Sequence, residues 1–183
     1  NEIERFKQVN EDGTSIATYA NIDEERTKGI EYNFVGTLRK NLRLMLSGSV
    51  YWDEINSDLF GSDYNKTIQG QRIRFTTMWN INPKTEFMFF MFYRPASDIA
   101  IGTMNALNFS SMSFKRKLMD DRLNLTLNIG DPFNLSGFGF TTWGDFDDDG
   151  IRDWEQTSNR KWQSRNIRLS IEYRFGKMED LSL

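Results

Sequence analysis

The sequence predicts an all-β fold of antiparallel strands, and three observations support this prediction. Apolar and polar residues alternate with a period of two along most of the chain, as expected when successive side chains point to opposite faces of a strand. The alternating segments run for about ten residues, the length of a strand that spans a membrane. The connections between them alternate between short turns and longer polar segments.

The strands are expected in about eight segments of the chain. The last segment, NIRLSIEYRF at 166–175, is the clearest, because Ile167, Leu169 and Ile171 fall on one face and Arg168 and Ser170 on the other. Segments 84–95 and 102–115 carry apolar residues on both faces. The predicted strands lie near 2–9, 15–38, 42–54, 69–81, 84–95, 102–115, 121–130 and 164–175.

The connections predict which ends of the strands lie together. Three are tight: RKN at 39–41, INPK at 81–84 and KRKLMDD at 115–121. The others, around 10–14, at 54–69, around 95–101 and at 131–163, are longer, polar or irregular. This alternation is typical of an outer-membrane barrel with short periplasmic turns and long external loops, so 131–163 is expected to be a long external loop.

Composition excludes several classes of function. The 183 residues carry a formal charge of −3 and include no cysteine and no histidine. Disulfides, Cys-based zinc sites and Ser-His-Asp catalysis are therefore impossible, we expect no catalytic residues, and the charge gives no indication of nucleic-acid binding. The longest apolar run, FMFFMFY at 87–93, is far too short for a transmembrane helix, and no signal peptide is recognised.

Aromatic residues favour the membrane interpretation over a soluble sheet. Trp52, Trp79, Tyr173 and Phe175 lie at the ends of predicted strands, where the aromatic girdles of membrane barrels occur. Periodicity alone does not separate a barrel from a soluble sandwich, because both place one face of each strand against apolar surroundings.

Several stretches together resemble a known family. They are YANIDEERTKGIEYNFVGTLRKNLRLMLSGSVYWDEI at 19–55, the turn FKRKLMDDRL, DRLNLTLNIGDPFN at 121–134 and RNIRLSIEYRFGKMED at 165–180. They resemble the C-terminal part of the TonB-dependent receptor-like outer membrane protein beta-barrels common in Bacteroidetes. The matching features are a strand that ends in a D-P-F-N turn and a last strand of the form L-S-I-E-Y-R-F-G-K.

The resemblance implies a larger barrel of 22 strands with an N-terminal plug, of which this chain would be the C-terminal third, ending in a tail at 176–183. It also implies energised import of a bulky ligand across the outer membrane of a Gram-negative bacterium. The expected partners are the lipid bilayer, the TonB complex acting through the plug, and a surface lipoprotein. Residues 1–183 alone are not expected to form a stable barrel, because open strand edges would remain.

An acidic segment, GDFDDDGIRDWEQ at 144–156, predicts a calcium loop. Hard cations prefer oxygen ligands, and this spacing places oxygens at positions 1, 3, 5, 7 and 9 around a glycine at position 6. It resembles the D-x-D-x-D-G-x-x-D pattern of thrombospondin type-3 calcium repeats, although Gln156 stands where the bidentate acid belongs. The alternative is a solvated acidic loop. The candidate ligands are Asp145, Asp147, Asp149, Ile151, Asp153 and Glu155.

Two other interpretations remain open from the sequence. One is a complete, small, eight-stranded outer-membrane protein, since eight strands can close a barrel. The other is a soluble, calcium-binding β-sandwich, in which Leu123, Leu125 and Leu127 would face a core. The sequence does not identify the transported ligand.

Overall fold

The computed structural model describes residues 2–9, 14–22, 24–57, 64–99, 102–144, 153–161 and 165–176. Every helix or strand in these ranges is a β-strand, and every strand pairing is antiparallel. The all-β, antiparallel fold predicted from the sequence is confirmed. Within the described ranges, no helix has the length and apolar character needed to cross a membrane.

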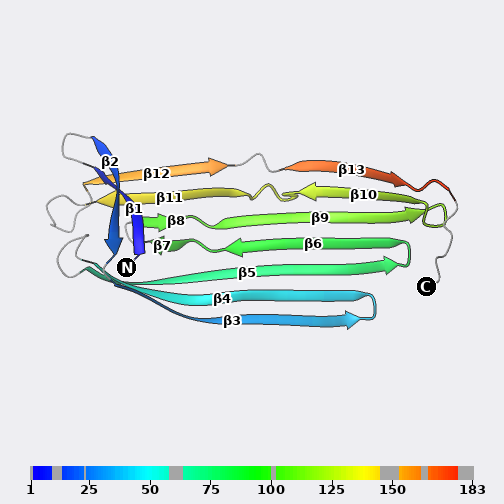
Figure 1. Ribbon diagram of the computed structural model, residues 1–183, viewed down its shortest axis with the longest axis horizontal. Helices are drawn as coiled ribbons and strands as arrows, with labels where there is room; N and C mark the ends of the chain where they lie inside the picture. Colours follow the sequence, from blue (N-terminus) through cyan, green and yellow to red (C-terminus); the bar gives the residue numbers. More distant parts are fainter. Residues whose placement is uncertain are drawn as a thin grey trace.

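Seven strands lie side by side in the main sheet, in the order β13-β10-β9-β6-β5-β4-β3 (Figure 1). In the described part of the chain, β3 and β13 each pair with a strand on one side only, so the sheet is open and does not close into a barrel. The strands are β3 (Glu24–Arg39), β4 (Leu42–Ser57), β5 (Tyr64–Asn82), β6 (Thr85–Arg94), β9 (Leu107–Leu118), β10 (Leu123–Gly130) and β13 (Asn166–Tyr173).

Three tight turns connect strands of the main sheet, and all lie at the same end of it (Figure 1). They join β3 to β4 at 40–41, β5 to β6 at 83–84 and β9 to β10 at 119–122. The last turn has positive φ at Met119, Asp120 and Asp121, a conformation that aspartate tolerates better than most residues. Lys84 Nζ lies 3.9 Å from Asp120 Oδ1 and so connects two of these turns.

Four strands form a second sheet at the opposite end, in the order β12-β11-β8-β7. They are β7 (Ser97–Ile99), β8 (Gly102–Met104), β11 (Gly137–Gly144) and β12 (Trp154–Lys161). In Figure 1 they continue the lines of β6, β9, β10 and β13 beyond the main sheet. Lys66 Nζ of β5 donates a hydrogen bond to the carbonyl oxygen of Ile99 (3.0 Å), which connects the two sheets.

The segment predicted as one strand over 15–38 is two strands with different partners. β2 (Ser15–Ile22) pairs with β1 (Glu2–Val9) in a separate two-stranded sheet, while β3 pairs with β4. The main sheet therefore has seven strands rather than about eight. Alternation specifies which residues share a face of a strand, but it does not specify the neighbouring strand.

Two segments expected to be loops are partly strand. Within 54–69, pairing continues from Glu54↔Thr67 to Ser57↔Tyr64. Within 131–163, β11 and β12 form an antiparallel pair over their whole lengths. Backbone hydrogen bonds form without apolar side chains, so polar strands in water leave a weak sequence signal. Most of β12 is exposed on both faces, which explains why its sequence shows no alternation.

The main sheet has no apolar core of the kind found in a sandwich. Among the described side chains, the buried apolar residues are Ile55 (6% exposed) and Ile68 (7%), both beyond the part of the sheet that carries its longest apolar runs. By contrast, Ile167 is 72% exposed and Leu169 61%. A sandwich would cover these side chains with a second sheet. The soluble-sandwich interpretation is therefore not favoured.

Candidate functional site

One face of the main sheet is predominantly apolar, and we call this surface the apolar band; Arg116, which donates a hydrogen bond to Thr85, lies on the same face near the periplasmic turns. The strand register places its members beside one another, as in the row in which Leu46 pairs with Phe34 on one side and Phe75 on the other. Side chains that expose this much apolar area require an apolar environment. The band includes Ile30, Phe34, Leu38, Leu42, Leu44, Leu46, Val50, Ile73, Phe75, Trp79, Phe87, Phe89, Met112, Phe114, Leu123, Leu125, Leu127, Ile129, Ile167, Leu169 and Ile171.

The edge of the apolar band that lies farther from the three tight turns, which we call its upper edge, runs obliquely across the strands. On β13 the band ends at Ile167, and the row of paired residues through Ile167 reaches β3 at Gly36. On β3, however, the band continues for six more residues, to Ile30. Six residues advance about 20 Å along a strand, and six steps from strand to strand cover about 29 Å. The strands are therefore tilted by about 35° from the perpendicular to the edge of the band. Strands of outer-membrane barrels tilt by ≈ 35–45°, so a horizontal membrane fits this band.

Polar and charged residues replace apolar ones on the same face beyond the band. Gln69 and Gln71 continue the outer face of β5 past Ile73, and Lys28 donates a hydrogen bond to Glu54 across β3 and β4 (2.9 Å). This hydrogen bond and the positive charge of Lys28 lower the pKa of Glu54, which lies outside the band. Charged pairs of this kind mark the boundary between lipid and water.

The sheet extends well beyond that boundary, and we call this part the external extension. It comprises β7, β8, β11, β12 and the ends of β3, β4 and β5 at 24–29, 51–57 and 64–72. The nine residues of β5 from Tyr64 to Arg72 alone span about 30 Å at the rise of a β-strand. The long connections of an outer-membrane barrel face the outside of the cell, so the extension projects away from the periplasm.

The turn at 131–136 separates β10 from β11 and contains a buried carboxylate. Asp131 is 2% exposed, and its Oδ1 and Oδ2 accept hydrogen bonds from the backbone N–H groups of Leu135 (2.9 Å) and Ser136 (3.2 Å). The backbone N–H of Asp131 itself donates to the carbonyl oxygen of Ser110 on β9 (2.8 Å). Asp131 therefore fixes both the shape of the turn and its attachment to the sheet.

The same turn carries apolar side chains to the outer face. Phe133, 54% exposed, packs edge-on against Phe89 of the apolar band, with ring centroids 6.2 Å apart. Because this contact lies near the upper edge of the band, Phe133 occupies the position of an aromatic at the membrane interface.

The opposite face of the main sheet, the luminal face, mixes charged and polar side chains with apolar ones such as Met78, Met88 and Phe92, and it carries more basic than acidic side chains. A wide barrel encloses water, so charges on this face remain hydrated. Its charged members are Arg43, Arg72, Arg74, Arg94, Lys115, Lys117, Arg168 and Arg174, against Glu25, Glu31, Asp53, Glu86 and Glu172.

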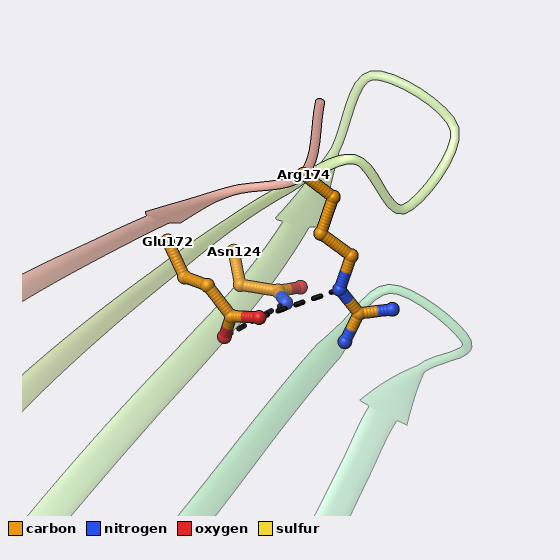
Figure 2. A network of polar contacts seen from close by, with 3 residues as sticks. All are labelled: Asn124, Glu172 and Arg174. Atoms are coloured by element: carbon orange, nitrogen blue, oxygen red, sulfur yellow. Dashed lines mark hydrogen bonds and ion pairs between the residues drawn. The ribbon is translucent and has the colours of Figure 1, made fainter. Parts of the chain in front are cut away.

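One polar network on the luminal face joins β10 to β13 (Figure 2). Asn124 Nδ2 donates to Glu172 Oε2 at 3.4 Å, and Arg174 Nε donates to Glu172 Oε1 at 3.3 Å. Glu172 and Arg174 are largely exposed, so the ion pair itself contributes little stability. Asn124 and Glu172 are register partners, and the network therefore helps to fix how β10 and β13 align.

The predicted calcium loop lies mostly outside the described residues, which exclude Asp145, Asp147, Asp149 and Ile151. Of the other candidates, Asp153 donates its backbone N–H to the carbonyl oxygen of Gly144 (2.9 Å), and Glu155 lies in β12. The described residues contain no group of three or more acidic, cysteine or histidine side chains arranged to hold a metal. Calcium binding by this loop therefore remains a prediction.

An open, tilted sheet with a lipid-facing apolar band and a hydrated luminal face is the wall of an outer-membrane β-barrel protein. The chain belongs to the outer membrane protein beta-barrel family, which matches residues 1–173. Searches of curated proteins and of solved structures found no match. The protein is therefore located in the outer membrane of a Gram-negative bacterium, in contact with the lipid bilayer. Members of this family are typically not enzymes.

Proposed function

We propose that this chain forms part of the wall of a large TonB-dependent receptor barrel, which imports a bulky ligand across the outer membrane. The observation that carries this proposal is the direction of the two edge strands. Six antiparallel pairings separate β3 from β13, so both edges run from the external to the periplasmic end. A barrel made of antiparallel neighbours cannot close by pairing two strands that run the same way.

Closure of the wall therefore needs an odd number of additional strands between β13 and β3. A second copy of the sheet in the same membrane orientation does not supply them. Its edge strands run in the same direction as those of the first copy, so each junction between the copies would join two parallel strands. The strands of a larger barrel supply them, and 22 strands leave fifteen beyond the seven of the main sheet. This arithmetic excludes closure by the seven strands alone, and a 22-stranded receptor-type barrel satisfies it.

A complete eight-stranded barrel is the weaker candidate. It requires one further transmembrane strand that pairs with both β3 and β13. In the structure, β1 pairs with β2 in a separate sheet and does not occupy this position. The interior of so narrow a barrel is filled by side chains, whereas this luminal face carries many long basic residues.

The remaining parts of the proposal follow from the resemblance to TonB-dependent receptors. The luminal face would surround a plug, and the TonB complex would act on that plug from the periplasm. The external extension would offer a polar surface to the ligand and to a surface lipoprotein. A purified C-terminal domain of TonB is expected to bind the native protein in detergent, and the absence of binding would contradict TonB-dependent import.

The size of the native polypeptide tests the proposal directly. Outer-membrane extracts probed with an antibody against residues 131–163 are expected to show a band several times heavier than 21.5 kDa, which shifts on boiling. Closed barrels resist unfolding by detergent at room temperature, and this resistance causes the shift. A heat-shifting band near 21.5 kDa would instead identify a complete small barrel.

Residues 1–183 refolded alone in detergent are expected not to give a monodisperse, heat-resistant barrel. The unpaired edges of β3 and β13 would expose backbone hydrogen-bonding groups, which are costly in lipid and promote aggregation. Size-exclusion chromatography and gel shift report this outcome. The native protein, treated identically, provides the control.

Calcium is expected to stabilise the loop at 144–156, since bound cations offset the mutual repulsion of clustered carboxylates. For the native protein, calcium addition should protect this loop from proteolysis, and Asp147→Asn should remove the protection. Equal cleavage with calcium and with chelator would contradict the prediction.

A further inference from the structure

A shallow hollow of about 370 Å³ lies where the luminal face of β3, β4, β5 and β6 continues into the external extension. Two arginines of β5 form its basic part. In the register, Arg72 lies beside Ser49 and Arg74 beside Ser47, and Phe92 of β6 is on the other side of Arg74. Guanidinium groups, serine hydroxyls and an aromatic side chain therefore line one open hollow.

Among the described residues, the ion pairs do not include these two arginines. In the described part of the chain, neither Arg72 nor Arg74 has a carboxylate within ion-pair distance, unlike Lys28, Lys84 and Arg174. Residues two apart on a strand point to the same face, so both guanidinium groups face the lumen. Their hydrogen-bond donors are available to an anionic group.

Arg72 is held in position by an aromatic contact. Its Cζ lies 5.1 Å from the ring centroid of Tyr51, within the range of a cation–π interaction. The Tyr51 ring in turn lies directly against Gly70, where any Cβ would collide with the ring. Glycine at this position therefore lets Tyr51 lie flat and support Arg72.

An apolar surface adjoins the arginines. Phe92 lies beside Phe109 of β9, with ring centroids 6.4 Å apart, and both rings are on the luminal face. Where water reaches this face beside a plug, covering the aromatic rings with a ligand removes apolar surface from water and is favourable. The hollow thus combines a basic part with an apolar wall.

We propose that this hollow binds a ligand group that carries an oxyanion, such as a carboxylate, phosphate or sulfate, attached to a flat apolar body. The oxyanion accepts hydrogen bonds from Arg72, Arg74 and the two serines, because guanidinium groups match oxyanions in geometry as well as charge. The apolar body packs against Phe92. This inference rests on the proposed import function, since it assigns the hollow to a ligand that passes along the lumen.

Glu31 is the carboxylate among the residues that line the hollow. It lies on β3, on the far side of Ser49 from Arg72. It can accept a hydrogen bond from a hydroxyl or ammonium group of the ligand, and it repels a second anionic group. The hollow is therefore suited to a single oxyanion rather than to a polyanion.

Binding of phenyl phosphate to the native, full-length protein in detergent tests the proposal by calorimetry at low salt. Saturable binding is expected, and the double variant R72Q/R74Q should weaken it by about tenfold or more, the loss typical of charged hydrogen bonds. F92A should weaken phenyl phosphate but leave inorganic phosphate unchanged. Benzoate and phenyl sulfate, compared with phenyl phosphate, identify the preferred oxyanion.

Matched variants separate a defined site from the general positive charge of the lumen. R43Q and R168Q remove luminal charges outside the hollow and should leave phenyl phosphate binding unchanged. Tyr51→Leu should weaken binding, while Tyr51→Phe, which keeps the ring, should retain it. Equal losses in R43Q and R74Q, or no saturable binding, would overturn the proposal.

The binding measurement tests the hollow separately from the proposed function, because binding in detergent requires neither TonB nor plug movement. Absent binding combined with TonB-dependent behaviour would overturn the site alone. Retained binding in a protein that does not engage TonB would overturn the import function alone.

Discussion

Replacing Leu127 by arginine is expected to prevent assembly of the protein in the outer membrane. Leu127 lies within the apolar band on β10, between Phe114 of β9 and Leu169 of β13. A charged side chain on the lipid face near the bilayer midplane costs about 2–4 kcal/mol. The yield of heat-shifting protein in outer-membrane extracts, and its unfolding by guanidinium in liposomes, measure the effect.

Asn128→Arg is the matched control for this experiment. Asn128 is the next residue of the same strand, and it faces the lumen beside Arg168 and Ser113. An arginine there is hydrated, and its repulsion from Arg168 costs about 1 kcal/mol or less, so assembly should proceed much more nearly as in the native protein than in Leu127→Arg. If Asn128→Arg fails and Leu127→Arg assembles, the two faces of the sheet have been assigned the wrong way round.

Replacing Asp131 by alanine is expected to destabilise the turn between β10 and β11. The change removes the acceptors of the Leu135 and Ser136 N–H groups at a position that is only 2% exposed. A buried donor left without an acceptor costs about 1–3 kcal/mol, and because only the Ser136 N–H is buried while Leu135 is exposed, a loss of about 1–3 kcal/mol is expected. Guanidinium unfolding of the full-length protein in liposomes measures it.

Two variants of the same turn serve as controls. Asp131→Asn retains one acceptor oxygen and should fall between the native protein and Asp131→Ala. Asn134 has φ 56°, a conformation that glycine adopts easily, so Asn134→Gly should change stability little. Equal stability of Asp131→Ala and the native protein would show that the carboxylate does not hold the turn.

The strands of the main sheet show which conclusions the alternation of apolar and polar residues supports and which it does not. Leu123, Leu125 and Leu127 read as one apolar face, and the structure places them on one face. Their alternation, however, fits a sandwich core as well as a lipid-facing wall. The open single layer and the oblique apolar band separate these interpretations, because both depend on how neighbouring strands align.

The external extension shows where sequence patterns fail. Residues 64–68 and β12 read as loop, because neither segment shows an apolar period and most of β12 is exposed on both faces. Their pairing with Ser57–Asp53 and β11 depends on backbone hydrogen bonds, which every residue type except proline can donate. No side-chain pattern identifies such strands in advance.

The candidate site, too, could be predicted only in part from the sequence. Arg72 and Arg74 could be assigned to the polar face of β5 from the sequence, but their hollow could not, because Tyr51 and Phe92 come from neighbouring strands. The DPFN motif was visible as a turn after a strand, whereas the burial of the Asp131 carboxylate was not.

The sequence by itself determined the all-β class, the two faces of each membrane strand and the alternation of short and long connections. These properties are local, since they follow from the period of a strand and from turn chemistry. Only the tertiary structure decided the seven-stranded order, the common direction of β3 and β13, the tilt of the apolar band and the luminal hollow. Each of these depends on strand register, which joins residues far apart in the chain and is set by the sheet as a whole.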